Sequence, residues 1–260
     1  WGYGAEVSAL SVVDNVLEAE IAPSERAGQP CRIALRPATG IVRVLNRTRT
    51  APKAGVADLG IHRSQGSNTF DFWGHLPVGA APFKADLAVY DPASLFGSLL
   101  RAALERRGIT IAGRVRSIDA RGREHEPFDH DQAHELAFLE SDPLSDVVRE
   151  TNKESQNLYA ELLFRSTGRI AGPADAKATD AAAVAAMSGF LAEAGIDPVS
   201  VAVFDGSGLS RHNLVTPGAT VRLLTYVRTR PYGEFYAGSL PEAAADGTLE
   251  RRFANTAAAG

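Results

Sequence analysis

A crowded polar segment from Arg121 to His134 (RGREHEPFDHDQAH) divides the chain into two parts with different hydrophobic patterns. Most of the chain before it alternates apolar and polar residues, as half-buried strands do, whereas apolar residues after it recur at helical spacing. Charged, turn-rich stretches of this kind are typical of surface connections between domains. The sequence therefore predicts an α+β protein with a domain boundary near Leu136.

The first part is predicted to be mostly sheet. Two apolar runs flank Asp14-Asn15 within residues 7–21, which predicts a hairpin of two strands. Further strands are expected over residues 32–35, 41–48, 68–73 and 83–89.

A helix is predicted over residues 94–107, and a strand over residues 109–115 follows it. Because this helix–strand pair can rejoin a sheet begun before Pro30, we expect a β-rich insertion that contains a second, nested small domain. The nested domain would comprise residues 31–91, the outer domain residues 1–30 and 92–136, and the last domain residues 137–260.

The second part is predicted to be a helical lobe. Helices are expected over residues 143–150, 155–166, 179–194 and 219–229. A short apolar strand over residues 199–204 runs directly into the turn Asp205-Gly206-Ser207-Gly208.

The composition is that of an ordinary globular protein, with 260 residues of which 45% are hydrophobic and 22% charged. A formal net charge of −4 gives no electrostatic reason to expect a nucleic-acid partner. No apolar run approaches the roughly 20 residues of a membrane-spanning helix, and the single cysteine, Cys31, forms no disulfide within the chain. The sequence does not set an oligomeric state.

Ser155 and Asn157 lie two residues apart just ahead of an apolar-periodic helix, in the segment NKESQNLYAELLFR. A hydroxyl relays a proton, and a carboxamide both donates and accepts hydrogen bonds, so the pair is able to steer a lysine and a substrate amide in one cleft. Serine and asparagine are also favoured as helix caps. The two residues by themselves leave both interpretations open.

A second candidate is the segment from Phe204 to Thr216 (FDGSGLSRHNLVT), a strand that opens into a glycine-punctuated loop. Gly206 and Gly208 permit a tight turn or the close approach of a ligand, and Arg211 is able to hold a carboxylate with two parallel hydrogen bonds. A plain turn is the alternative. The segment does not match the nucleophile elbow of serine hydrolases, because the residues two before and two after Ser207 are not glycine.

His130, Asp131 and His134 carry metal-capable side chains, but they lie in the polar connection without zinc or iron spacing. A solvated linker is the favoured interpretation of this cluster. We therefore predict no metal site.

Taken together, several stretches resemble the class C low-molecular-mass penicillin-binding proteins, the D-alanyl-D-alanine carboxypeptidase/endopeptidase family. The resemblance rests on SQNLYAELLFR, DGSGLSRHNLVTP, WGYGAEVSALSVVDN, YDPASLFGSLLRAALERRGITIAG, SDPLSDVVRETNKES and SLPEAAADGTLERRFANTAAAG. Several long segments in the family's order are far more specific than one three-residue motif. The resemblance implies a partial transpeptidase/β-lactamase-like domain after the β-rich insertion.

In this family a serine, activated by a lysine three residues later, attacks the D-Ala-D-Ala carbonyl and forms an acyl-enzyme. The resemblance implies that Ser155 passes a proton to the leaving amine and that Asn157 holds the substrate amide and the lysine. It also implies that Tyr3, Leu209 and Arg211 line a pocket for the diaminopimelyl side chain. The implied partners are peptidoglycan stem peptides ending in D-Ala-D-Ala and β-lactams, in the periplasm or elsewhere outside the cytoplasm.

The sequence departs from the family pattern at two elements. No serine has a lysine three residues on, and none of the four lysines is followed by Thr-Gly. Because the family's order places Ser-x-x-Lys before Trp1-Gly2-Tyr3 and Lys-Thr-Gly after Gly260, we expect an internal stretch of the enzyme that is inactive alone. The alternative is a non-catalytic envelope protein that binds peptidoglycan or a protein partner on the same scaffold.

Overall fold

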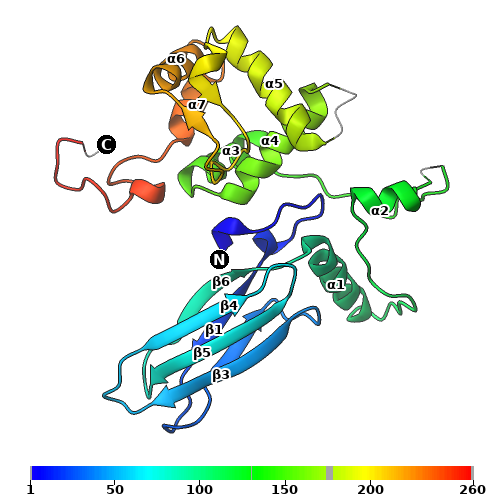
Figure 1. Ribbon diagram of the computed structural model, residues 1–260, viewed down its shortest axis with the longest axis vertical. Coiled ribbons are helices and arrows are strands. Elements are labelled where there is room, and N and C mark those ends of the chain that lie inside the picture. Colours follow the sequence, from blue (N-terminus) through cyan, green and yellow to red (C-terminus); the bar gives the residue numbers. More distant parts are fainter. Residues whose placement is uncertain (1, 130, 174–177, 259–260) are drawn as a thin grey trace. The chain divides into compact units, whose positions relative to one another are not determined.

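The computed structural model describes residues 2–129, 131–173 and 178–258. The chain divides into two units, Trp1–Ala133 and His134–Gly260 (Figure 1). The first unit is rich in strands and the second in helices, which confirms the α+β prediction.

The first sheet of unit 1 has three antiparallel strands in the order β2-β1-β6. These are β2 (Arg32–Arg36), β1 (Val16–Ala22) and β6 (Phe83–Ala88). Along β1 every second side chain is buried, as expected for a strand with one face against the core.

The second sheet has the order β3-β5-β4, with β3 and β5 parallel and β4 and β5 antiparallel. Its strands are β3 (Arg43–Ala51), β5 (Thr69–Pro77) and β4 (Asp58–Arg63), of which β4 was not predicted. One core joins the two sheets, because Ile21 of β1 and Leu87 of β6 belong to the same buried cluster as Phe70 and Phe72 of β5. Each such large apolar side chain contributes about 1.5–3 kcal/mol when buried.

The predicted hairpin over residues 7–21 is wrong in its first strand. Only the part from Val16 onward is a strand, and the residues before it form a 3₁₀ turn, η2 (Val13–Asn15). The fully buried Asn15 explains the difference. Its side chain accepts from the Val12 N–H at 3.1 Å and donates to the Glu6 carbonyl at 2.9 Å, so it folds the preceding residues back as a loop.

The predicted strand over residues 109–115 is also wrong, and no strand is assigned to that segment. Instead, the Arg101 guanidinium donates to the carbonyls of Ile111 and Gly113 at 3.1 and 2.7 Å. These bonds use carbonyls that a β-ladder would need, and they tie the segment to the preceding helix. The helix–strand pair therefore does not rejoin a sheet.

The nested arrangement of residues 31–91 within 1–30 and 92–136 remains a proposal. In the structure β1 pairs with both β2 and β6, so strands from either side of the proposed division share one sheet. The predicted domain boundary near Leu136 likewise remains a proposal. The structure divides into its two units between Ala133 and His134.

The predicted helix of unit 1 is confirmed as α1 (Pro92–Glu105). It begins after Asp91, whose carboxylate accepts from the Ser94 N–H at 3.1 Å and so satisfies a free donor of the first turn. Its buried Leu95 packs against Leu17 and Val89. A second short helix, α2 (Ala120–His125), was not predicted and lies within the polar connection.

The four helices predicted for unit 2 are confirmed. They are α3 (Leu144–Lys153), α4 (Asn157–Ala171), α5 (Thr179–Glu193) and α6 (Pro217–Arg228), and a further helix, α7 (Gly233–Ser239), was missed. The predicted strand over 199–204 is shorter than expected. It is present as β7 (Val201–Ala202), which pairs antiparallel with β8 (Leu214–Val215).

Small residues allow α4 and α5 to pack closely (Figure 1). A Cβ atom on Gly168 of α4 would lie 2.4 Å from the backbone nitrogen of Ala183, so only glycine fits there. On the facing helix Ala182 and Ala183 are buried. The alanine-rich composition of α5 thus brings it against the helix that begins at Asn157.

Candidate functional site

Ser155 lies in the short turn that joins α3 to α4. Its side chain is exposed, and its φ of 57° places a residue other than glycine in the left-handed region. Such a conformation costs about 1–3 kcal/mol, and residues of this kind are concentrated at functional sites. The turn therefore presents a hydroxyl to solvent in a conformation that the neighbouring structure has to maintain.

Asn157 is the first residue of α4 and is half-buried. The helix begins two residues later than predicted. Its N-cap residue is Gln156, whose side chain makes no capping hydrogen bond. The alternative in which Ser155 caps the helix is therefore wrong. The structure places Ser155 before the cap and Asn157 after it.

Glu161, one turn further along α4, is a buried carboxylate that the sequence analysis did not identify. It is only 7% exposed. Its Oε1 accepts from Arg165 Nε at 2.8 Å, and its Oε2 accepts from the Gly206 N–H at 2.7 Å. Both oxygens are thus used, one within the helix and one on the glycine loop.

Gly206 itself lies against α4. A Cβ atom at this position would be 2.4 Å from Phe164 Cβ and 2.5 Å from the Ala160 carbonyl oxygen, so a larger residue does not fit without movement of the loop. The structure thus brings together the two segments that the sequence singled out. The glycine loop rests on the same helix that carries Asn157.

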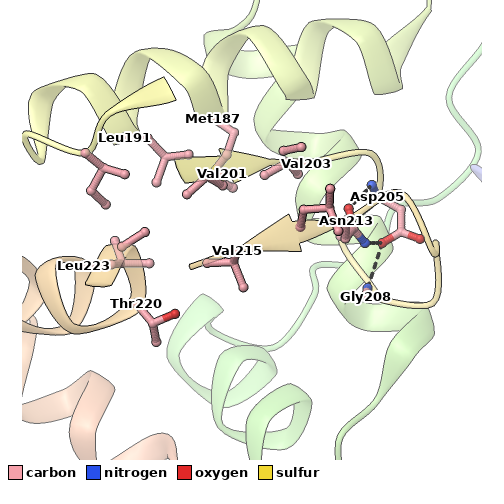
Figure 2. Close-up of a pocket in the computed structure, with 15 residues that line it drawn as sticks. Met187, Leu191, Val201, Val203, Asp205, Gly208, Asn213, Val215, Thr220 and Leu223 are labelled. Carbon is pink, nitrogen blue, oxygen red and sulfur yellow. Dashed lines mark hydrogen bonds between the residues drawn. The ribbon is translucent and has the colours of Figure 1, made fainter. Parts of the chain in front are cut away.

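The glycine loop is closed by Asp205 and Asn213. Asn213 Nδ2 donates to Asp205 Oδ1 at 2.6 Å (Figure 2), and Asn213 Oδ1 accepts from the Phe204 N–H at 2.7 Å. The Asp205 carboxylate also accepts from the backbone N–H groups of Gly208 and Ser210, each at 2.7 Å. These bonds give the loop one defined shape.

The electrostatic state of Asp205 follows from these contacts. Burial raises the pKa of its carboxyl, but hydrogen bonds from Asn213 and the loop backbone oppose that effect and leave the pKa below its usual range. Asp205 is therefore ionised at neutral pH. Its charge stabilises the loop, since both of its oxygens accept hydrogen bonds within it.

The predicted substrate-binding residues of unit 2 lie on this loop. Leu209 is 52% exposed, and Arg211 is exposed as well. Gly208, with φ of 78°, makes the turn that precedes them. Tyr3 belongs to unit 1, in the 3₁₀ turn η1 (Gly2–Gly4), and is 65% exposed. Its part in the pocket remains a prediction.

A pocket of about 290 Å³ lies next to the glycine loop. Figure 2 shows the residues that line it. Apolar side chains from α5, β7, β8 and α6 form most of its wall, among them Leu191, Val201 and Leu223. Its polar edge is made by Asp205 and Asn213, which bond to each other. The pocket can hold an apolar group, but Ser155 and Asn157 do not line it.

Within residues 2–129, 131–173 and 178–258, no group of three or more His, Cys, Asp or Glu side chains is placed to hold a metal ion. Of the weak cluster in the polar connection, His130 lies outside the described residues. No helix in the described part is long and apolar enough to cross a membrane.

Known proteins resemble the whole chain. A family model described as D-Ala-D-Ala carboxypeptidase 3 (S13) matches residues 1–260. A D-alanyl-D-alanine carboxypeptidase of Actinomadura sp. (strain R39) is 35% identical over 274 residues, which cover 100% of this chain and 48% of that protein. The D-alanyl-D-alanine carboxypeptidase DacB of Haemophilus influenzae is 25% identical over 256 residues, or 96% of this chain and 50% of that protein. The chain thus spans about half the length of these curated relatives.

Solved structures show the same fold. The crystal structure of penicillin binding protein 4 (dacB) from Haemophilus influenzae has a TM-score of 0.77 at 24% identity and covers 97% of this chain and 53% of that one. The same protein complexed with a novel β-lactam has a TM-score of 0.73 at 24% identity, over 96% of this chain and 56% of that one.

Proposed function

The chain belongs to the D-Ala-D-Ala carboxypeptidase 3 (S13) family, and we propose that it is part of a serine enzyme that hydrolyses D-alanyl bonds of peptidoglycan peptides through an acyl-enzyme. The match of the family model to residues 1–260 is the observation that carries this proposal. The packing of the glycine loop on the helix that begins at Asn157 supports it, because it attaches the loop that carries Leu209 and Arg211 to that helix through Gly206.

The proposed roles follow the chemistry of each side chain. Ser155, exposed in its turn, would pass a proton to the leaving amine, because a hydroxyl both donates and accepts. Asn157 would hold the substrate amide and the lysine of the Ser-x-x-Lys element, since a carboxamide is able to bond both at once. Neither residue is a nucleophile in this proposal.

Substrate selection would fall to the glycine loop. Arg211 would bind the carboxylate at the end of the diaminopimelyl side chain with two parallel hydrogen bonds. Leu209 would contact the methylene groups of that side chain, and Tyr3 would complete the pocket. The exposed positions of Leu209 and Arg211 on a loop of fixed shape are compatible with these roles.

The partners and the location follow from the reaction. The enzyme would act on stem or cross-link peptides that end in D-Ala-D-Ala and would be acylated by β-lactams, which mimic that end. Its substrate lies outside the cytoplasm, so we propose a periplasmic or other extracytoplasmic location. No cofactor is required by an acyl transfer of this kind.

The experiment compares two proteins, the chain of residues 1–260 and the product of the complete reading frame. We expect the complete protein to release D-alanine from a peptide ending in D-Ala-D-Ala, and residues 1–260 alone to release none, since they contain neither Ser-x-x-Lys nor Lys-Thr-Gly. A complete protein that binds the peptide but releases no D-alanine would instead be the non-catalytic binding protein, and the proposal would fail.

A further inference from the structure

The end of α3, immediately before the Ser155 turn, is held by residues 239–247, which we call the clamp segment. Asn152 of α3 donates through Nδ2 to Ser239 Oγ at 2.8 Å. Ser239 is fully buried, and its hydroxyl donates in turn to the Tyr236 carbonyl at 2.7 Å. The hydroxyl therefore has a fixed orientation between its two partners.

The next residue of α3 makes an ion pair with the same segment. Lys153 Nζ donates to Asp246 Oδ2 at 2.5 Å, and the Lys153 side chain is only 16% exposed. The other oxygen of Asp246 accepts from the Glu242 N–H at 2.8 Å, so the clamp segment's own backbone orients the carboxylate. The hydrogen bond from Lys153, together with that from Glu242, lowers the pKa of Asp246 and keeps it ionised.

A backbone contact adds to the ion pair. Gly247 has a φ of 53°, and a Cβ atom there would lie 2.4 Å from the Lys153 carbonyl oxygen. Only glycine allows the clamp segment to approach α3 so closely. Two consecutive residues, Asn152 and Lys153, are thus held by side-chain and backbone contacts just before the turn.

Two backbone hydrogen bonds flank Ser155 in the turn. The Glu154 N–H donates to Glu150 O at 3.1 Å and the Gln156 N–H to Thr151 O at 3.0 Å. Ser155 lies between them in its left-handed conformation, which persists only where the surrounding structure fixes it. The contacts of Asn152 and Lys153 supply that restraint from the α3 side.

We propose that Asp246 is a positioning residue for Ser155 and Asn157, acting through Lys153 by fixing the end of α3. This inference rests on the proposed function, since it concerns the same reaction. It assigns a role to the segment that contains Asp246 and Gly247, which are more than 80 residues along the chain from Ser155. Lys153 is a structural partner in this arrangement, because its ammonium is engaged by Asp246.

The test uses the complete protein with Asp246→Asn, Asp246→Glu and, as a control, Asp146→Asn. The control removes the partner of a second α3 ion pair, Asp146–Arg149 at 2.7 Å, in which both side chains are about half exposed. Labelled penicillin gives the rate of acylation and the fraction of molecules labelled. Hydrogen exchange of the peptide over residues 150–158 reports on the turn independently of catalysis.

For Asp246→Asn we expect acylation slower by a factor on the order of ten or more, because small displacements of catalytic groups are costly. The labelled fraction at the end point should stay that of the wild type, exchange of the turn should be faster, and Asp246→Glu should recover part of the rate. Asp146→Asn should change neither measurement. An acylation rate equal to the wild type, or a loss confined to the labelled fraction, would overturn the positioning role.

The two proposals fail in different ways. A wild-type protein that takes up no label overturns the proposed function and with it the catalytic purpose of the clamp. Unchanged exchange of the turn in Asp246→Asn overturns the clamp alone, whatever the acylation result.

Discussion

The Gly206 N–H donates to Glu161 Oε2 at 2.7 Å, and this bond links the glycine loop to the helix that begins at Asn157. Glu161 lies one helical turn beyond Asn157, so the loop is attached close to the start of α4. The buried carboxylate is held in turn by Arg165 at 2.8 Å. Glu161 has no proposed part in the chemistry, but it holds the loop that carries Leu209 and Arg211 against α4.

Replacing Glu161 tests this link. Glu161→Ala leaves the Gly206 N–H without its acceptor and the Arg165 side chain without its partner, so we expect a loss of unfolding free energy of about 1–3 kcal/mol. Urea denaturation followed by far-ultraviolet circular dichroism measures it. Glu234→Gln, an exposed acid in the first turn of α7, is the control and should shift stability by less than about 0.5 kcal/mol.

Gly206→Ala tests the close approach of the loop to α4. The new Cβ would meet the Ala160 carbonyl oxygen at 2.5 Å, and because backbone cannot yield as a flexible side chain does, we expect destabilisation of about 1–3 kcal/mol. Gly189→Ala is the matched control. It lies inside α5 with no atom within 4 Å of the added Cβ, so it should stabilise by about 0.5–1 kcal/mol. Equal effects of the two substitutions would contradict the packing described.

The lowered pKa of Asp205 predicts a pH dependence of stability. A carboxyl whose pKa is lower in the folded state stabilises the fold above its ordinary value of about 3.9 and loses that contribution as pH falls through the lower, folded value. In Asp205→Asn this part of the acid sensitivity should be absent. Denaturation of both proteins from about pH 6 downward measures the difference. Parallel curves for the two proteins would show that Asp205 has its ordinary pKa.

The helices of unit 2 were predictable because their apolar spacing and stops are local features of the sequence. The failures in unit 1 arose from side chains acting on neighbouring backbone. Asn15 folds residues 11–15 into a turn where propensity favoured a strand, and Arg101 binds the carbonyls of a segment that reads as a strand. The local pattern of apolar and polar residues does not show which backbone carbonyl a side chain such as Asn15 or Arg101 will bind.

The site was predictable in its parts but not in its assembly. Ser155, Asn157 and the glycine loop carry a recognisable chemistry, whereas the contact of Glu161 with Gly206 spans 45 residues and that of Lys153 with Asp246 spans 93. Glu161 also reads as one half of an exposed pair with Arg165, four residues on. Only the fold shows that its carboxylate is buried and shared with the loop.

The most direct test of the account is the acylation of Asn157→Ala by labelled penicillin in the complete protein, beside the wild type and the control Glu234→Gln, a substitution at an exposed position of α7. If the start of α4 forms one wall of the acyl-transfer cleft, the Asn157 variant should acylate at least about 100-fold more slowly while its unfolding curve stays close to that of the wild type. The control should acylate at the wild-type rate. A folded Asn157→Ala protein that acylates as fast as the wild type would contradict the assignment of this turn to the active site.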